Sequence, residues 1–533
     1  MKRDSFSFSF INRTTIRLNQ STHTMKRTVI FPIIALLLLT AGCFPSERAG
    51  NPKPRIIVTC DPELDDHNSL LRYLLYSTDY DTEGLIYASS QVHWKGDGKG
   101  TPMYREGSEY ARMGLGPQTS WRWAEGERFI HSDVEAYAKV YPNLKVHNPD
   151  YPSPESLLSL IYEGNVAFES DISEDTPGSD RIKEVLLDDD PRPVYVQVWG
   201  GPSTVSRALK SIEEQYKGTP EWDDVYAKVS AKCKLCLSGA QDTSFRDYIQ
   251  PNWPGVESII INADITPIGY GASRGVRVPE DTLYYSAAWT EENISSKGIF
   301  GELYRVWGDG KTMVEGDRTD YFGLSGYSAD QLREMGYYVW TAPRPKGSFI
   351  SEGDTPEFLN LIGNGLRGWQ SPEWGGWAGR LRELSDREKQ MGYSSPFGSR
   401  SSGEVVLPDF VPAVQNGLAA RMTWSTTSDF SAANHEPKVS GPVSVSAKPG
   451  STVKIKAKVS DPDGDSLNCY WAQWKVYRSF GGDVAISDPF SASVSVTVPS
   501  DAEAGDTIHL ILTAEDSGTP KLTGYLRTVI TVK

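Results

Sequence analysis

The stretch Arg55-Ile-Ile-Val-Thr-Cys-Asp-Pro-Glu-Leu-Asp-Asp66 decides the fold of this chain. An apolar run of strand length ends there at three carboxylates, those of Asp61, Asp65 and Asp66. Such a strand is typical of a buried parallel sheet, whose carboxyl ends open onto the crevice where α/β proteins bind ligands. Carboxylates packed this closely repel one another unless a cation or shared protons offset their charge. Apolar side chains at helical spacing follow, so the stretch predicts a strand, an acidic loop and a helix over 64–76.

A simpler interpretation of the acids is a turn with a helix N-cap, because Asp is favoured in the first helical turn. That accounts for one or two of the three aspartates. We therefore favour a metal or sugar site, and the helix cap stays open as the alternative.

The rest of the chain predicts an α/β fold followed by an all-β domain. Apolar runs alternate with helical patterns up to about residue 405, which indicates a mainly parallel sheet flanked by helices. Residues from about 436 onward alternate with period two and are separated by turns, which predicts an immunoglobulin-like β-sandwich of about 100 residues. The predicted strands of the first part are 55–60, 83–89, 194–199, 232–238 and 257–263.

The N-terminus predicts export. Met25-Lys26-Arg27 is basic, Val29–Leu39 is apolar but short for a membrane span, and Ala41-Gly42 precedes Cys43. We expect a lipoprotein signal that is cleaved before a lipid-bearing Cys43, and an ordinary secretory signal is the alternative. The predicted organisation is an extension with signal peptide at 1–42, a tether at 43–54, an α/β domain at 55–405, a linker with a short helix at 406–435 and a sandwich at 436–533.

The composition limits the classes of molecule that we expect this chain to bind. The net charge of −15 argues against a nucleic-acid polymer. The chain has 15 Trp and 26 Tyr, and flat aromatic faces suit sugar stacking, although most such residues serve a core. Residues 368–377 hold Trp369, Trp374 and Trp377 among glycines, so we expect sugar contacts from these three rings. The oligomeric state is left open.

At this point the sequence resembles the nucleoside hydrolases. Their signature is similar to Asp61-Pro-Glu-Leu-Asp-Asp66 after an apolar strand, to the turn Val198–Thr204, and to the late turn Glu352–Phe358. The segment Ser238–Asp242, together with 375–380 and 433–437, resembles more specifically the bacterial cellulose-binding proteins with a nucleoside hydrolase-like domain and a C-terminal β-sandwich.

The resemblance implies a Ca²⁺ site. Its ligands would be Asp61, Asp66, Asp354 and the backbone carbonyl of Trp199, with Asp61 also acting as the general base of glycosidic hydrolysis. Asp65 would bind a sugar hydroxyl. Substrate contacts would also come from Gln241 and Asp242.

Three positions depart from the nucleoside hydrolase pattern. Thr59 stands where those enzymes have a further aspartate, Glu63 where they have glycine, and Gly353 where many have a histidine that helps the base leave. Two functions therefore remain: a Ca²⁺-dependent glycosidic-bond hydrolase of the cell envelope, acting on a saccharide or nucleoside, and a lipoprotein that binds cellulose or another polysaccharide without cleaving it.

Overall fold

The computed structural model describes residues 53–261, 268–274, 279–371, 373–381, 403–404, 410–476 and 479–533. The predicted signal peptide, Cys43, nearly all of the tether and the predicted boundary at 405–406 lie outside the described residues. None of the helices in the described ranges combines the length and apolar character that crossing a membrane requires.

One six-stranded sheet forms the centre of the first part, and all of its strands are parallel. The strands are β1 Arg55–Cys60, β2 Asp81–Tyr87, β3 Ile161–Glu163, β4 Val194–Val198, β5 Cys233–Ser238 and β6 Glu257–Ile261. Their order in the sheet is β3-β2-β1-β4-β5-β6. The strand order reverses between β1 and β4, and in such sheets the ligand crevice opens at the carboxyl ends of the two strands that flank the reversal. The predicted parallel α/β fold is confirmed.

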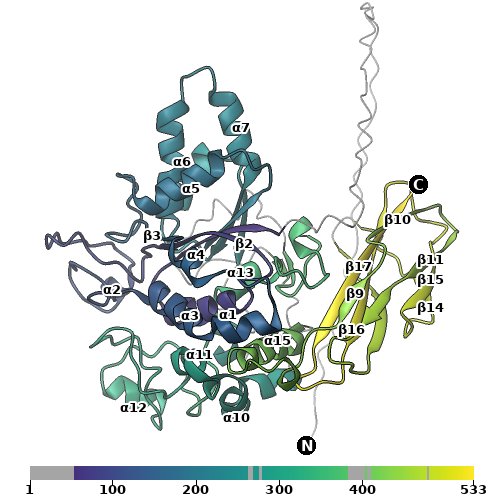
Figure 1. Cartoon of the computed structure of the whole chain (residues 1–533). Coiled ribbons are helices and arrows are strands. Elements are labelled where there is room, and N and C mark those ends of the chain that lie inside the picture. The colour runs from purple at the N-terminus through teal and green to yellow at the C-terminus, as the bar shows by residue number, and fades with distance from the viewer. Residues whose placement is uncertain are drawn as a thin grey trace, which may run out of the picture. The chain divides into compact units, whose positions relative to one another are not determined.

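Helices cover both faces of this sheet (Figure 1). In β1, Ile56 and Val58 belong to the core shared with α1, α3 and α15, whereas Ile57 belongs to the core shared with α5 and α6. This explains why Ile56, Ile57 and Val58 are apolar in succession rather than at alternate positions. The α-helices are α1 Leu64–Leu75, α2 Glu109–Arg112, α3 Phe129–His147, α4 Pro154–Leu158, α5 Pro177–Leu187, α6 Ser203–Tyr216, α7 Trp222–Lys232, α8 Gln250–Asn252, α9 Gly271–Arg274, α10 Ala287–Thr290, α11 Gly298–Leu303, α12 Ala329–Glu334, α13 Thr355–Leu359 and α15 Val411–Trp424.

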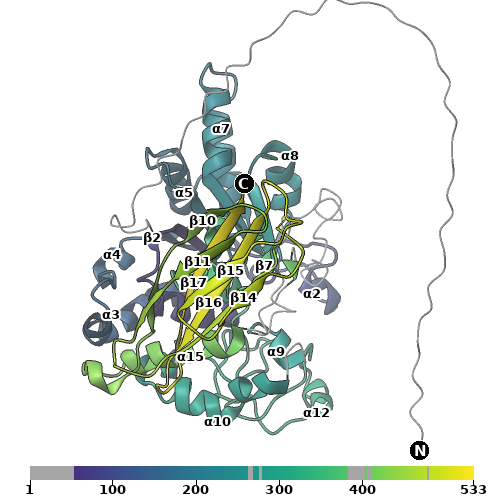
Figure 2. The ribbon, with the colours of Figure 1, turned by 90° about the vertical axis from the view of Figure 1, so that its right-hand side faces the viewer.

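The C-terminal part consists mostly of antiparallel strands in two main sheets, seen face-on in Figure 2. Their orders are β10-β17-β16-β13 and β11-β15-β14. Ile455, Trp471, Val496 and Leu510 are buried in a shared core, as the predicted sandwich requires. Its strands are β9 Lys438–Ser440, β10 Ser444–Ala447, β11 Thr452–Lys456, β12 Lys458–Ser460, β13 Asn468–Gln473, β14 Ala485–Ser487, β15 Ser493–Thr497, β16 Thr507–Glu515 and β17 Thr523–Val532, and β7 Arg380–Leu381 pairs with β8 Gly403–Glu404 outside it.

Candidate functional site

The acidic loop lies at the carboxyl end of β1, beside the reversal of strand order. Asp61 follows β1 directly, Glu63 precedes α1, and Asp65 and Asp66 lie in the first turn of α1. The Asp61 backbone N–H donates to Asp66 Oδ1 at 3.1 Å. One acid therefore holds the start of the helix in the manner of a cap, whereas Glu63, at the capping position itself, makes no capping hydrogen bond.

Asp61 is the most constrained of these acids, with a fully buried side chain. Its Oδ2 accepts hydrogen bonds from Ser90 Oγ at 2.5 Å and His93 Nδ1 at 3.1 Å. Among the described residues, its Oδ1 has no donor. One carboxylate oxygen is thus fixed by protein donors while the other keeps its lone pairs for a ligand.

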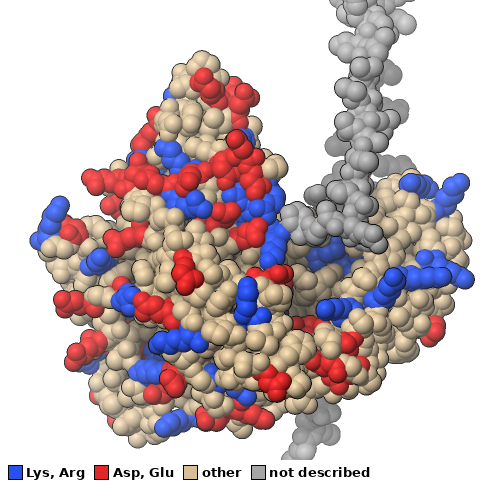
Figure 3. All heavy atoms as spheres, viewed as in Figure 1, with Lys and Arg blue, Asp and Glu red and all other residues tan. Residues whose placement is uncertain are grey.

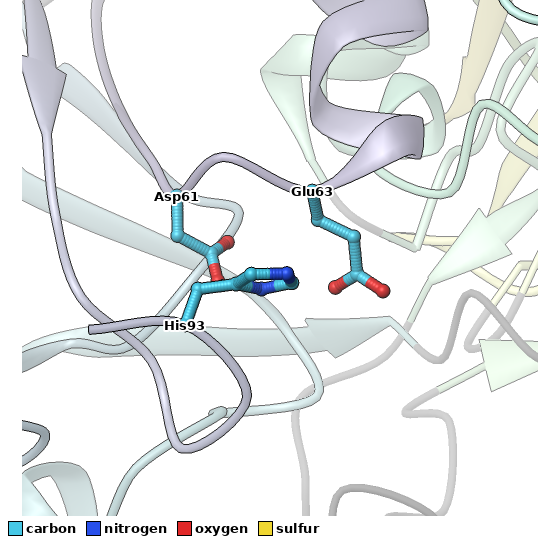
Figure 4. A group of neighbouring side chains, drawn as sticks. All are labelled: Asp61, Glu63 and His93. Carbon is cyan, nitrogen blue, oxygen red and sulfur yellow. The ribbon is translucent and has the colours of Figure 1, made fainter. Parts of the chain in front are cut away.

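His93 and Glu63 complete a cluster with Asp61, and Figure 4 shows the three side chains turned toward one another. One ligand atom from each lies within 4.8 Å of the others, and the same holds for Glu63, Asp65 and Asp66. Burial raises the pKa of Glu63 well above its usual range, and the charges of Asp65 and Asp61 raise it further. The surroundings of Glu63 therefore disfavour the charged form of its carboxyl group.

Sequence analysis did not predict Ser90, His93 or Glu63 as site residues, and it noted Glu63 only as a departure from the nucleoside hydrolase pattern. The position of Ser90 and His93 in the chain could have indicated that they belong to the site. Ser90 and His93 follow β2, which lies next to β1 in the sheet, so their loop had to end beside Asp61.

Asp354 approaches the cluster from the loop before α13. Burial and the charge of Asp65 raise its pKa well above the usual range, and burial and the charge of Asp354 do the same for Asp66. Within the described part of the chain, Asp354 Oδ2 has no donor. Mutual repulsion of this kind shows that the carboxylates of Asp66 and Asp354 share one low-dielectric region.

A buried ion pair fixes the loop that carries Asp354. Arg72 on α1 and Glu352 are both fully buried, and Arg72 Nη2 donates to Glu352 Oε1 at 3.0 Å. Arg72 also donates to the Val414 carbonyl of α15 at 2.8 Å. The loop that carries Asp354 is therefore tied to α1, the helix that carries Asp66.

The turn after β4 approaches Asp61 through glycine. A Cβ atom on Gly200 would lie 2.8 Å from Asp61 Oδ1, and one on Gly201 would lie 2.6 Å from Asp242 Oδ2. Any side chain here would displace these carboxylates. The preceding Trp199 carbonyl accepts a hydrogen bond from Gln241 Nε2 at 2.6 Å, so Gln241 reaches the predicted metal-ligating carbonyl itself.

Asp65 and Asp242 face protein donors. Tyr270 Oη donates to Asp65 Oδ1 at 3.2 Å. Asp242 is buried and accepts from the backbone N–H of Ser244 at 2.7 Å and of Ser203, the first residue of α6, at 3.1 Å. Asp242 therefore has a structural role at the start of α6, beside the crevice where sequence analysis expected a substrate contact.

Glu169, in the loop after β3, is a further buried acid that sequence analysis did not single out. It is 2% exposed, and burial raises its pKa to about 7. Arg105 Nε lies 3.4 Å from Glu169 Oε1, and the charge of Asp242 opposes ionisation.

The structure does not bring the three predicted tryptophans to the acids. Trp377 is only 3% exposed, and its Nε1 donates to Tyr525 Oη of β17 at 3.2 Å, which corrects the expectation of an exposed stacking ring. Trp374 packs edge-on against His509 of β16, with ring centroids 4.9 Å apart. The Trp369 carbonyl accepts from Tyr195 Oη at 2.8 Å, near the amino end of β4 and thus away from the crevice. The sandwich covers much of this glycine-rich loop, a contact that a local sequence pattern cannot reveal.

Comparison with known proteins agrees with the geometry. Residues 55–381 match the family model described as "Cellulose-binding Sde182, nucleoside hydrolase-like domain", and residues 452–532 match "Cellulose-binding protein Sde0182, C-terminal domain". No curated protein matches the chain.

Among solved structures, the chain is similar to a nucleoside hydrolase-related hypothetical protein from Saccharophagus degradans that is associated with carbohydrate metabolism. The two are 26% identical, the match covers 90% of this chain and 100% of the other, and the TM-score is 0.65. The tandem Ig repeats of Dlar match at 18% identity, over 18% of this chain and 48% of the other, and the titin M3 domain at 16%, over 18% and 96%. Both have TM-scores of 0.13 and carry no argument. The family model spans more than half of the chain. The chain belongs to the family of cellulose-binding proteins with an Sde182 nucleoside hydrolase-like domain.

Proposed function

We propose that this protein is a Ca²⁺-dependent hydrolase of a glycosidic bond, acting on a saccharide or, as the less favoured substrate, a nucleoside. The observation that carries the proposal is the state of Asp61. It is fully buried, its Oδ2 is held by Ser90 and His93, and its Oδ1 lacks a donor among the described residues. A carboxylate that is oriented on one oxygen and open on the other is suited to accept a proton from water.

The donor set fits a hard cation. Asp61 Oδ1 and Asp354 Oδ2 are buried oxygens without a donor in the described residues, and Asp66 is destabilised as an anion by its acidic neighbours. Ca²⁺ prefers six to eight oxygen ligands. Asp61, Asp66, Asp354 and the Trp199 carbonyl would hold it, and the bound ion would offset their charge, orient sugar hydroxyls and lower the pKa of a water molecule.

The chain's own residues divide the remaining work. Because Ser90 and His93 hold Oδ2, the remaining lone pair of Asp61 Oδ1 accepts a proton from the attacking water, and the water oxygen bonds to the anomeric carbon. Glu63, whose raised pKa favours the protonated form, donates a proton to the leaving oxygen as the glycosidic bond breaks. Asp65 accepts a hydrogen bond from a sugar hydroxyl. A base and an acid are thus supplied by two carboxyl groups in different environments.

The relative and the family models favour a saccharide. The solved structure that matches 90% of the chain is associated with carbohydrate metabolism, and both family descriptions name cellulose binding. The face shown in Figure 3 carries Asp and Glu interspersed with Lys and Arg, which supports the proposal that a nucleic-acid polymer is not the partner. Export and lipid attachment at Cys43 complete the proposal and rest on the N-terminal sequence alone.

The experiment measures Ca²⁺-dependent release of reducing sugar or free base from cello-oligosaccharides, other oligosaccharides and nucleosides. We expect product from a saccharide, loss of at least 100-fold in kcat with Asp61→Asn, and no change with Asp483→Asn on an exposed sandwich loop. Calorimetry on chelator-treated protein should show heat of Ca²⁺ binding and a higher Tm after Ca²⁺ is restored. Saccharide binding without product from any substrate would instead support the non-catalytic polysaccharide-binding lipoprotein.

The anchor has its own test. Cys43→Ala should move the protein from the membrane fraction to the soluble fraction of the producing bacterium. Unchanged membrane fractionation would contradict lipid attachment and leave the hydrolase proposal intact.

A further inference from the structure

A cavity of about 240 Å³ lies beside the crevice, at the β2–β3 edge of the sheet. Its aromatic lining comes from Tyr87, Trp123, His131 and Tyr162, and charged groups at its rim include Lys95 and Glu163. Sites that enclose a drug-sized ligand usually measure roughly 300–1,000 Å³. This cavity is smaller, which suits one ring of a longer ligand rather than a whole one.

The lining combines flat apolar faces with hydrogen-bonding groups. Tyr87 and His131 are stacked, with ring centroids 5.8 Å apart and an angle of 16° between the planes. Trp123 and Tyr162 are partly exposed. Lys95 Nζ lies 3.6 Å from a Glu163 carboxylate oxygen, and both side chains are more than half exposed. Pyranose rings present apolar C–H faces and a periphery of hydroxyls, which match these two kinds of surface.

Hydrogen bonds assign the proton on His131. The His131 backbone N–H donates to Tyr87 Oη at 3.2 Å, so the Tyr87 hydroxyl proton is free to donate to His131 Nδ1, 2.9 Å away. In a neutral ring this leaves the proton on Nε2. Burial lowers the pKa of His131, which favours the neutral ring. His131 then offers an N–H donor that a sugar hydroxyl can accept.

Two segments connect the cavity with the acidic crevice. The first runs from His93, which donates to Asp61, to Lys95 at the cavity rim, with the fully buried Trp94 between them. The second contains Arg122, whose charge acts on Glu63, followed by Trp123, which lines the cavity.

Arg122 has φ of +47°, in the left-handed region that few side chains adopt. Ion pairs to Glu109 at 3.3 Å and Asp317 at 2.8 Å hold it there. Backbone strain of this kind is found where surrounding structure forces it, often at functional sites. Here it fixes the point where the chain passes from the crevice to the cavity.

From this placement we infer that the cavity is a binding subsite for one pyranose ring of a β-glucan chain, adjacent to the ring whose bond faces Asp61. Trp123 stacks on the ring, while His131, Lys95 and Glu163 bond its hydroxyls. This assignment rests on the proposed function for the position of the bond to be cut. The subsite assigns a substrate class to that function, namely oligosaccharides of more than one ring. Nucleosides do not belong to this class.

The test uses cellohexaose and the full chain carrying Asp61→Asn, so that the probe is not consumed. Calorimetry should show binding, and adding Trp123→Ala should weaken it about tenfold, the size expected for one lost stacking contact. Lys95→Ala, which removes a hydroxyl-binding group with a side chain more than half exposed, serves if Trp123→Ala lowers the Tm strongly. Phe490→Ala removes a 73% exposed aromatic ring from the sandwich and should leave the affinity unchanged.

The outcomes separate this proposal from the hydrolase. Unchanged affinity in a folded Trp123→Ala or Lys95→Ala protein, no binding of cellohexaose at all, or loss of binding with Phe490→Ala alone would overturn the subsite. Weakened binding with Trp123→Ala, in a protein whose unmutated form releases no product, would support the subsite and remove the hydrolase proposal.

Discussion

The acidic crevice and the junction with the sandwich are both buried and charged, yet they differ in sign and in how their charges are satisfied. In the crevice, Asp61 and Asp354 each keep a carboxylate oxygen without a donor among the described residues. At the junction, the fully buried Arg527 donates to the carbonyls of Leu366 at 2.5 Å and Gly375 at 2.8 Å, and lies 5.7 Å from the ring of Trp374. At the junction, carbonyl acceptors satisfy the donors of the cation, although burial lowers the pKa of Arg527 to about 9, whereas the crevice leaves carboxylate oxygens that only a ligand can satisfy.

Removing the junction cation should have the largest effect on stability. Arg527→Met leaves the Leu366 and Gly375 carbonyls buried without their donor, at roughly 1–3 kcal/mol each. We expect the free energy of unfolding to fall by about 4 kcal/mol, measured by urea denaturation. Lys475→Met, which breaks an exposed pair with Asp483, should change it by less than about 1 kcal/mol. Equal effects from the two variants would contradict the contrast.

Acid should weaken the junction through His509. Its Nδ1 faces Arg527 Nη1 at 3.4 Å, and burial, with help from this cation, lowers the pKa of His509 to about 4. The unfolded chain takes up a proton near pH 6.5 and the folded one does not, so stability is complete above pH 6.5 and is lost as pH falls toward 4. The loss should reach about 3 kcal/mol, and His509→Gln should remove it. Thermal unfolding from pH 7 to 4 checks this, and parallel curves for the two proteins would refute it.

Near the crevice, Glu169 should make stability change with pH in the opposite direction. Burial raises its pKa to about 7, so the folded state keeps a proton that the unfolded state releases near pH 4.5. The associated stability is complete below pH 4.5 and is lost as pH rises to 7, by roughly 2–3 kcal/mol. Glu169→Gln should flatten this part of the Tm profile. A wild-type slope that Glu169→Gln leaves unchanged would show that other groups titrate there.

The sequence predicted the crevice better than the junction, and the reason is physical. Strand β1 and the acids after it are local features, and the carboxyl ends of parallel strands share one edge. The pairing of Asp61 with the turn at Trp199 came from the resemblance to the nucleoside hydrolases. The three-residue strand β3 is too short to give a pattern, and β16 has no clear alternation because five consecutive residues, Ile508–Leu512, are buried. Ligand atoms of His93 and Glu63 come within 4.8 Å of each other through loop paths that periodicity does not encode.

The tryptophans of residues 369–377 show a second limit of prediction from sequence. A glycine-rich loop with aromatic residues has the same sequence pattern whether its rings meet solvent, a sugar or another domain. Only the long-range contact of Trp377 with Tyr525 decides among these possibilities.

The smallest expected effect concerns a crevice acid and has an unusual sign. Asp66→Asn keeps an oxygen that can accept from the Asp61 backbone N–H, while it removes a carboxylate whose pKa burial and Asp354 raise. Because the raised pKa means that stability falls as pH rises, the variant should be more stable than the wild type by about 1 kcal/mol in chelator at pH 8, and nearly equal to it at pH 4. Adding Ca²⁺ should reverse the order, since the proposed site loses a ligand. Thermal unfolding of the wild type and the variant, each with and without Ca²⁺, measures these differences in stability. Asp483→Asn is the exposed control. A variant that is less stable than the wild type in chelator at pH 8 would mean that Asp66 stabilises the fold as a helix cap. The carboxylates of the crevice would then repel one another less than their burial indicates.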